Sequence, residues 1–71
     1  MDEFTIRELR EKAELTQAQL AFKIDVTPST VYNWEKGKNE PKASQLKAMA
    51  RFFGVSMDAI VFEVEEVKSA A

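Results

Sequence analysis

The 71-residue sequence contains neither cysteine nor histidine. Without cysteine the chain can form no disulfide and no thiolate nucleophile, and the usual sets of zinc ligands are missing. Without histidine it lacks the commonest general base and every Ser–His or Cys–His nucleophile pair. A chain this short also has little volume for a substrate pocket. These absences argue against an enzyme and against a bound metal or other cofactor.

Long apolar runs are absent too, and glycine and proline occur only twice each. No segment reaches the roughly 20 apolar residues that a membrane span needs, and no signal peptide is recognisable. We therefore expect a cytoplasmic protein that forms one domain with a small core and has no membrane partner. No glycine-rich phosphate loop is present, and no small-molecule ligand is indicated.

The net charge of −2 is unevenly distributed along the chain. Residues 16–51 hold six basic and three acidic side chains, a local charge of +3, whereas residues 58–71 hold four acids and one lysine, a local charge of −3. The local field of one face decides whether a protein attracts phosphates, so the overall acidity does not exclude DNA binding. A weakly basic face predicts few phosphate contacts and modest non-specific affinity.

The central segment, residues 16–38, has the pattern of two short helices joined by a tight turn. Thr16 can cap the first helix, and Gln19 three residues later completes the spacing of a capping box. Asp25 falls in the turn, where it tolerates a left-handed backbone better than most residues other than glycine. The apolar face of this first helix consists of Leu20, Ala21 and Ile24.

The second helix of this segment begins with Thr27 as N-cap and Pro28 at the first helical position, where a missing N–H costs nothing. Val31 and Trp34 form its buried stripe, and Gly37 can supply the left-handed residue that ends it. The other side of the helix stays free, at Pro28, Ser29, Tyr32 and Asn33. This pattern is typical of a helix-turn-helix, and we expect it to bind duplex DNA.

A further helix is predicted over residues 6–14, before the central segment. Thr5 and Glu8 have the spacing of a capping box, and Glu8 is expected to pair with Lys12 one turn later. The apolar stripe of this helix consists of Ile6, Leu9 and Ala13.

One charge in the central segment is placed unfavourably. Glu35 stands at the C-terminal end of the second helix, where a carboxylate opposes the helix dipole. A cation from another helix would offset this cost, and Arg10 is a candidate. Two unrelated solvated charges are the alternative that the sequence leaves open.

Two more helices are predicted after Gly37. The first covers residues 42–53, ends at Gly54, and buries Leu46, Met49, Ala50 and Phe53. Ser56 would cap a fifth, short helix, from which Met57, Ile60 and Val61 would close the core.

The last ten residues, 62–71, form an acidic tail. Phe62 and Val64 alternate with glutamates, as in a β-strand. An isolated strand is not stable, so this one would need either residues 1–4 or the same strand of a second chain as its partner. A frayed acidic end is the alternative.

These patterns together resemble the phage repressor and Cro-like helix-turn-helix family, often called the XRE family. The resemblance covers residues 5–61 and implies an all-α, compact five-helix DNA-binding domain, encoded by a bacterium or phage. We accordingly expect a domain over residues 1–61, followed by the tail, residues 62–71, as a candidate dimerisation strand. The matching residues are Ile6-Arg7-x-Leu9-Arg10, Leu15-Thr16-Gln17-x-x-Leu20-Ala21, Val31-x-x-Trp34-Glu35-x-Gly37-Lys38-x-x-Pro41 and Leu46-x-x-Met49-Ala50-x-x-Phe53-Gly54-Val55-Ser56.

The resemblance also implies roles for individual residues. Arg10 and Glu35 would form an ion pair between helices, and Gln17 would brace the recognition helix. The positions that face base edges in the major groove are Pro28, Ser29, Tyr32 and Asn33, with Tyr32 reaching a base methyl or the sugar–phosphate wall. The positions that meet phosphates are Arg10, Gln17, Lys36, Lys38, Asn39 and Lys42.

Three residues depart from the family pattern. Where this chain has Asp25, glycine is common in the family. Where it has Pro28, many members carry a polar side chain that reads a base. Where it has Lys42, a capping residue is common. None of these departures threatens the fold, but they leave the operator sequence undetermined. Asn33 can still make a bidentate pair with adenine, worth about 1–3 kcal/mol of discrimination.

A single recognition helix covers too little surface for operator-level selectivity, so we expect a homodimer on a palindromic operator with half-sites about 34 Å apart. The expected function is that of a transcriptional regulator, most simply a repressor. The alternative is a protein-interaction module with the same fold, such as an antitoxin or a repressor's partner. The expected dimer surface consists of Val55, Met57, Ile60, Val61, Phe62 and Val64.

Overall fold

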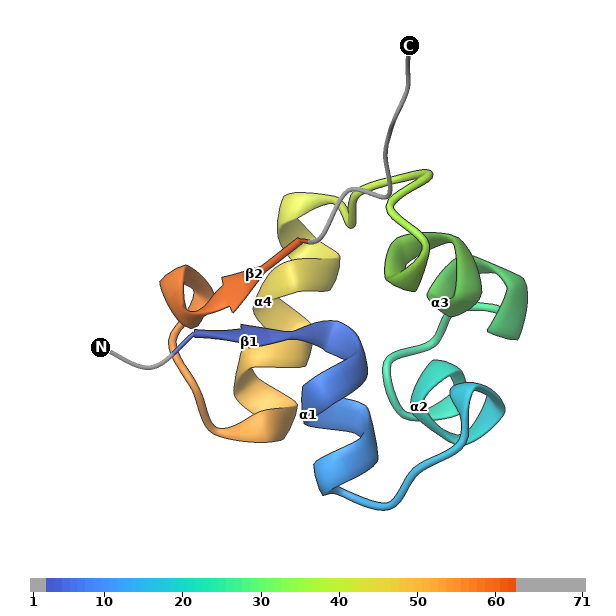
Figure 1. Cartoon of the computed structure of the whole chain (residues 1–71), viewed down its shortest axis with the longest axis horizontal. Coiled ribbons are helices and arrows are strands. Elements are labelled where there is room, and N and C mark those ends of the chain that lie inside the picture. Colours follow the sequence, from blue (N-terminus) through green and yellow to red (C-terminus); the bar gives the residue numbers. More distant parts are fainter. Residues whose placement is uncertain (1–2, 63–71) are drawn as a thin grey trace, which may run out of the picture.

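The computed structural model describes residues 3–62 of the chain. In this part the order of elements is strand, four α-helices, 3-10 turn and strand (Figure 1). The expectation of five helices is therefore wrong by one, because the last short helix is only a turn. The elements are β1 (Phe4–Thr5), α1 (Ile6–Lys12), α2 (Gln17–Lys23), α3 (Pro28–Glu35), α4 (Ala43–Phe53), η1 (Met57–Ala59) and β2 (Ile60–Val61).

The first helices begin where their capping residues predict. The Thr5 hydroxyl accepts a hydrogen bond from the backbone N–H of Glu8 at 3.1 Å, and the Glu8 carboxylate accepts one from the N–H of Thr5 at 2.9 Å. Thr16 and Gln19 form the same reciprocal pair at 3.0 and 2.8 Å. Each capping box satisfies two N–H groups that the first turn would leave without partners.

The expected pair between Glu8 and Lys12 is wrong, because the Glu8 side chain turns back to the cap. Arg7 instead pairs with Glu11, with 3.0 Å between the Arg7 Nε and a carboxylate oxygen. The Lys12 ammonium lies 5.5 Å from the ring centroid of Phe4. An i, i+4 spacing therefore indicates which charged side chains can form a pair. Competition from the helix cap determines which of these pairs form.

The core lies between the four helices and includes one residue of β2. Ala13, expected on the buried stripe, is instead the exposed C-cap of α1. Met57, expected to close the core, is 37% exposed because the turn that carries it is too short to form an inward face. The buried residues are Ile6, Leu9, Leu20, Ala21, Ile24, Val31, Trp34, Met49, Ala50 and Ile60.

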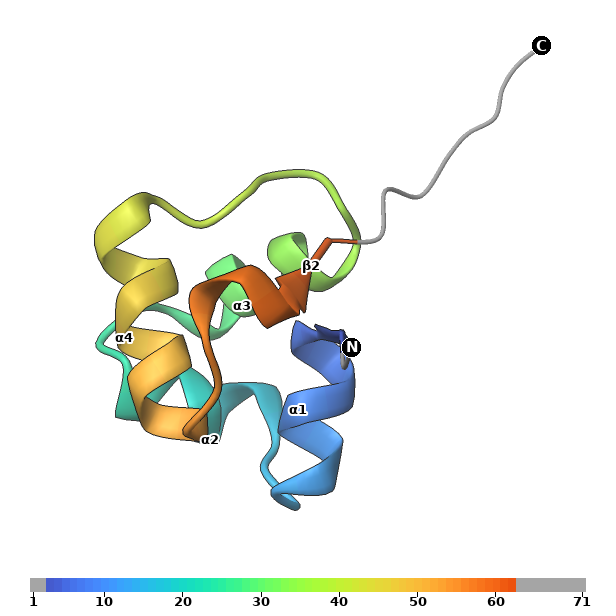
Figure 2. The same cartoon turned by 90° about the vertical axis from the view of Figure 1, so that its left-hand side faces the viewer.

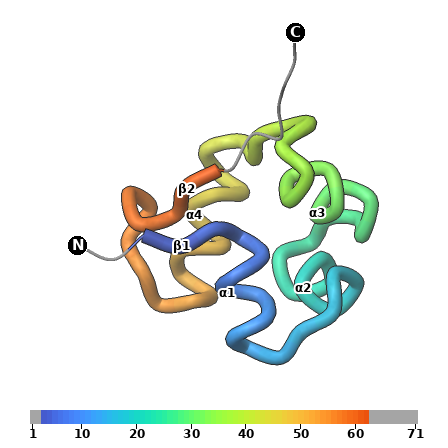
Figure 3. The backbone as a smooth tube through the Cα atoms, in the orientation of Figure 1, coloured from blue at the N-terminus to red at the C-terminus, as the bar shows by residue number. Residues whose placement is uncertain are grey.

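The predicted fifth helix is the three-residue turn η1, after which the chain becomes extended. Ser56 makes no side-chain capping hydrogen bond there, and Ile60 has φ −93° and ψ 115°. β2 then pairs in parallel with β1 (Figure 3). In this pairing Phe4 lies opposite Ile60. The N-terminal lead thus pairs with residues 60–61. Of the strand expected from Phe62 onward, only Phe62 is described and it is not in a strand, while Val64 lies outside the described residues.

Figure 2 shows η1 and β2 between α4 and α1. The pairing of β1 with β2 brings the two ends of the described chain together at this side. No helix formed by residues 3–62 is long and apolar enough to span a membrane.

The turn between α2 and α3 has the backbone geometry that the sequence predicts. Asp25 has a φ of +63°, in the left-handed region. The N–H of Val26 donates to the carbonyl of Ala21 at 2.9 Å, which closes the turn. Ala21 is 1% exposed, so a small side chain is what permits α2 and α3 to pack closely at this point.

Candidate nucleic-acid interface

The surface of α3 divides into a buried face and a free face. Val31 is completely buried and Trp34 is 3% exposed. Since successive residues of an α-helix are 100° apart, the residues expected to read bases share the opposite side. Pro28, Ser29 and Tyr32 are exposed there and Asn33 is half-buried. The structure thus brings the four expected base-reading residues onto one face.

Thr27 fixes the start of this helix. Its hydroxyl accepts a hydrogen bond from the backbone N–H of Thr30 at 3.2 Å and lies 2.8 Å from the Thr30 hydroxyl. Pro28 follows at the first helical position. Both threonine hydroxyls are therefore engaged with each other, so Ser29 is the hydroxyl of this turn that stays available at the free face.

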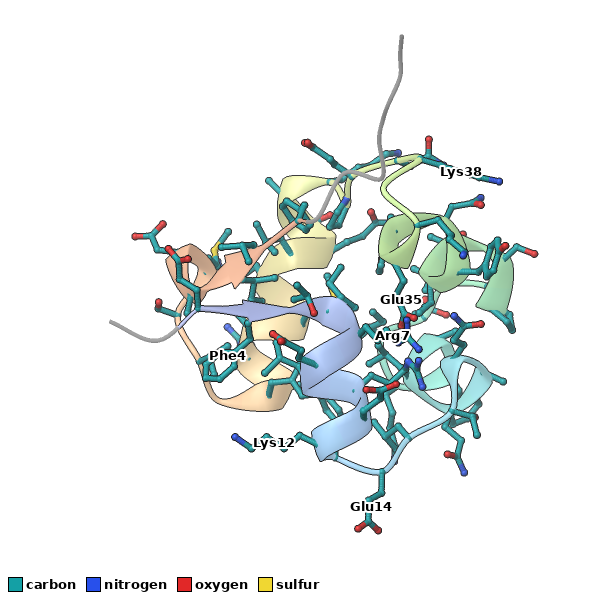
Figure 4. The ribbon with its side chains drawn as sticks, in the orientation of Figure 1. Phe4, Arg7, Lys12, Glu14, Glu35 and Lys38 are labelled. Carbon is teal, nitrogen blue, oxygen red and sulfur yellow. The ribbon has the colours of Figure 1, made fainter. Side chains whose placement is uncertain are left out.

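Glu35 anchors α3 to the two preceding helices. Its carboxylate accepts hydrogen bonds from Arg10 Nε at 2.6 Å and from Arg10 Nη2 at 3.1 Å. Gln17 Nε2 donates a third hydrogen bond to the same carboxylate at 3.0 Å. Arg10 Nη1 also donates to the carbonyl of Leu15 at 2.8 Å. The ion pair that the resemblance implies is present, and its hydrogen bonds link α1, the α1–α2 connection, α2 and α3. Figure 4 shows Glu35 on the side of α3 that faces α1 and α2.

The Arg10–Glu35 pair is shielded from water, since the side chains of Arg10 and Glu35 are 13% and 6% exposed. The hydrogen bond to Glu35 is the main reason that the pKa of Arg10 is raised above its ordinary value, and the Glu35 charge acts in the same direction against burial. Arg10 therefore stays charged. Because all three of its nitrogens donate within the protein, little of Arg10 is left to meet a phosphate.

The connection between α3 and α4 carries three lysines and one asparagine that are expected at phosphates. Lys36, Lys38, Asn39 and Lys42 are all exposed. The ammonium groups of Lys36 and Lys38 lie 5.8 and 5.7 Å from the ring centroid of Tyr32. The sequence pattern predicts separate roles for Tyr32, Lys36 and Lys38 and no contact among them. The i, i+4 spacing of Tyr32 and Lys36, together with Gly37, is the signal from which their contact could have been inferred.

The residues expected at the dimer surface fall into different environments. Ile60 is 5% exposed and packs in the protomer's own core, because β2 turns its side chain inward. Val55, Val61 and Phe62 are half-buried, and Met57 is exposed. Ile60 is thus used within the protomer, and the surface available to a second copy is smaller than expected.

A family model described as Helix-turn-helix matches residues 6–60, which is most of the chain. The chain therefore belongs to the helix-turn-helix family of phage repressor-like, XRE-type regulators, whose members bind DNA and regulate transcription. The family consists of transcriptional regulators and not of enzymes.

Three curated relatives illustrate the family. The HTH-type transcriptional activator BcrR of Enterococcus faecalis is 36% identical over 56 residues, which is 79% of this chain and 28% of that protein. The cryptic phage CTXphi transcriptional repressor RstR of Vibrio cholerae is 35% identical over 60 residues, 84% of this chain and 54% of that protein.

An uncharacterized HTH-type transcriptional regulator of Archaeoglobus fulgidus is 38% identical over 63 residues, 87% of this chain and 90% of that protein. The match thus spans about a quarter of BcrR and half of RstR, but nearly all of the archaeal protein. No solved structure matches the chain significantly.

Proposed function

We propose that this protein recognises a specific sequence in duplex DNA and acts in the cytoplasm as a transcriptional repressor. Residues 28–36 would lie in the major groove, with Ser29 and Asn33 reading base edges. One observation carries the proposal: the free face of α3 is exposed while its other face is fixed to α1 and α2 through Glu35. A recognition helix has to be rigidly held to keep its side chains in register with base edges.

The proposal includes a homodimer on a palindromic operator. One helix of eight residues covers only a few base pairs, and two-fold related copies would double the readout. The proposed contact between copies consists of the exposed or half-buried apolar residues of the segment that runs from just before η1 to just after β2, namely Val55, Met57, Val61 and Phe62.

The test is fluorescence anisotropy of the protein against labelled random duplexes at several salt concentrations, followed by sequencing of the bound fraction. We expect binding that weakens as salt rises, because each neutralised phosphate releases counterions. Enrichment of a palindrome would support the dimer. An absence of binding at low salt would refute the proposal and would leave the protein-interaction module as the function to pursue.

Two asparagines provide a matched test of base reading. Asn33→Ala should relax the base preference at one position of each half-site, because its amide would lose a bidentate contact worth about 1–3 kcal/mol. Asn39→Ala removes the same chemical group from the loop and should weaken all duplexes alike. Equal effects of Asn33→Ala on operator and random DNA would contradict its assigned role.

A further inference from the structure

Tyr32 occupies a position expected to face bases, yet its ring is in contact with two cations. The ammonium groups of Lys36 and Lys38 both lie within 6 Å of the ring centroid, the range of a cation–π contact. We propose that Tyr32 is a positioning residue, which holds Lys36 and Lys38 ready for phosphates of the DNA backbone and does not read a base. This inference rests on the proposed DNA-binding function and deepens it.

The backbone after α3 explains how Lys38 reaches the ring. Gly37 has a φ of +77°. The N–H of Lys38 donates to the carbonyl of Asn33 at 2.9 Å, and the N–H of Gly37 donates to that of Trp34 at 3.1 Å. These two bonds form a Schellman motif, which folds the residue after the glycine back against the last turns of the helix. In this motif Lys38 comes to lie against Tyr32.

Lys36 reaches the same ring by a different route. It is four residues after Tyr32 and is the C-cap residue of α3, so the two side chains share one side of the helix. A cation at this end of the helix is also favoured by the helix dipole. Tyr32 thus contacts one lysine through helical spacing and the other through the turn.

The arrangement favours a phosphate role for the three side chains. Each free lysine has to lose side-chain rotamer freedom when it meets a phosphate, and a contact made in advance reduces that loss. A ring face covered by an ammonium is not available to a thymine methyl group.

The chain supplies a matched control for this contact. Lys12 lies over the Phe4 ring at 5.5 Å, a contact of the same type. Figure 4 shows Lys12 and Lys38 at opposite ends of the molecule. Lys12→Gln removes one positive charge and one cation–π contact away from α3, and it should leave the salt dependence of DNA binding nearly unchanged.

The first measurement needs no DNA. In NMR spectra the ε-methylene protons of Lys36 and Lys38 should be shifted upfield by the ring current of Tyr32, relative to those of the exposed Lys47. The shifts should persist in Tyr32→Phe and disappear in Tyr32→Leu, while those of Lys12 stay constant in all three proteins. Unshifted lysine signals in the unmodified protein would overturn the proposal, whether or not the protein binds DNA.

The second measurement is the slope of log affinity against log salt on a random duplex. Tyr32→Leu should make the slope shallower by about 0.9 for each lysine that loses its phosphate. Tyr32→Phe should retain the slope, because it keeps the ring. Lys36→Gln and Lys38→Gln should each reproduce about half of the Tyr32→Leu effect.

Sequencing of the DNA bound by each Tyr32 variant separates the two roles of this residue. We expect the base preference to be unchanged in Tyr32→Leu while its affinity for all duplexes falls. A changed preference at one base position with an unchanged salt slope would show that Tyr32 reads a base and would refute the positioning role. If the unmodified protein bound no DNA, the proposed function would fail, and the phosphate role of the lysines would fail with it.

Discussion

Replacing Glu35 by glutamine tests whether one buried carboxylate holds the recognition helix in place. The substitution keeps the size of the side chain and removes its charge. The amide nitrogen would face donors of Arg10 and Gln17, so at least one of the three hydrogen bonds is lost. Arg10, with a side chain 13% exposed, would keep its charge without a partner.

The expected cost follows from two opposing effects. Leaving one member of a buried ion pair alone costs roughly 3–5 kcal/mol. Removing a carboxylate from the C-terminal end of a helix is favourable by about 0.3–1 kcal/mol. We therefore expect Glu35→Gln to lower the free energy of unfolding by about 3 kcal/mol. Domains of this size unfold with about 4–11 kcal/mol in total, so the loss would be a large part of it.

Urea unfolding followed by the fluorescence of Trp34 measures this loss, because Trp34 is the single tryptophan and is buried. Glu11→Gln is the control, since it breaks the exposed pair of Arg7 and Glu11 by the same substitution and should cost at most about 0.5 kcal/mol. Adding Arg10→Met to Glu35→Gln should recover part of the stability, because the unpaired charge is removed. If Glu35→Gln cost no more than Glu11→Gln, Glu35 would not be the residue that anchors α3.

Three further substitutions can be measured in the same urea assay or by circular dichroism. Trp34→Ala should cost about 3–5 kcal/mol, because it empties a large core site, and a loss below 1 kcal/mol would show that Trp34 is not a core residue. Glu14→Gly should stabilise the protein by about 0.5–1 kcal/mol, since Glu14 has a φ of +60° that glycine adopts without strain; a destabilised variant would contradict this. Phe22→Ser should change stability by less than about 0.5 kcal/mol, because Phe22 is 84% exposed, and a larger loss would mean that its ring packs on the domain.

The features that could be predicted from the sequence depend on neighbours within a few residues. Thr5, Thr16 and Thr27 each begin a helix as their capping patterns indicate. Asp25 adopts the left-handed backbone expected in the turn. The buried faces of α2 and α3 follow from a periodicity that spans only two helical turns.

The errors arose where two neighbours compete for one side chain, or where a contact depends on how the chain folds. Glu8 could pair with Lys12 or bind back to Thr5, and only the fold shows that it binds Thr5. The length of η1 could not be predicted, because β2 leaves the turn to pair with a strand from the start of the chain. The contact of Lys38 with Tyr32 depends on how the turn at Gly37 folds back against the helix. Helical periodicity assigns residues to the faces of a straight helix and therefore does not predict this contact.

The pairing of β1 with β2 has a consequence for folding kinetics. Phe4 and Ile60 are register partners in the two paired strands, although almost the whole described chain lies between them. Closing so long a loop is entropically unfavourable until the intervening helices have packed. We therefore expect this contact to form after the rate-limiting step of folding. Weakening the strand pair would then raise the unfolding rate and leave the folding rate unchanged. The strand pair therefore slows the unfolding of the domain without affecting how fast it folds.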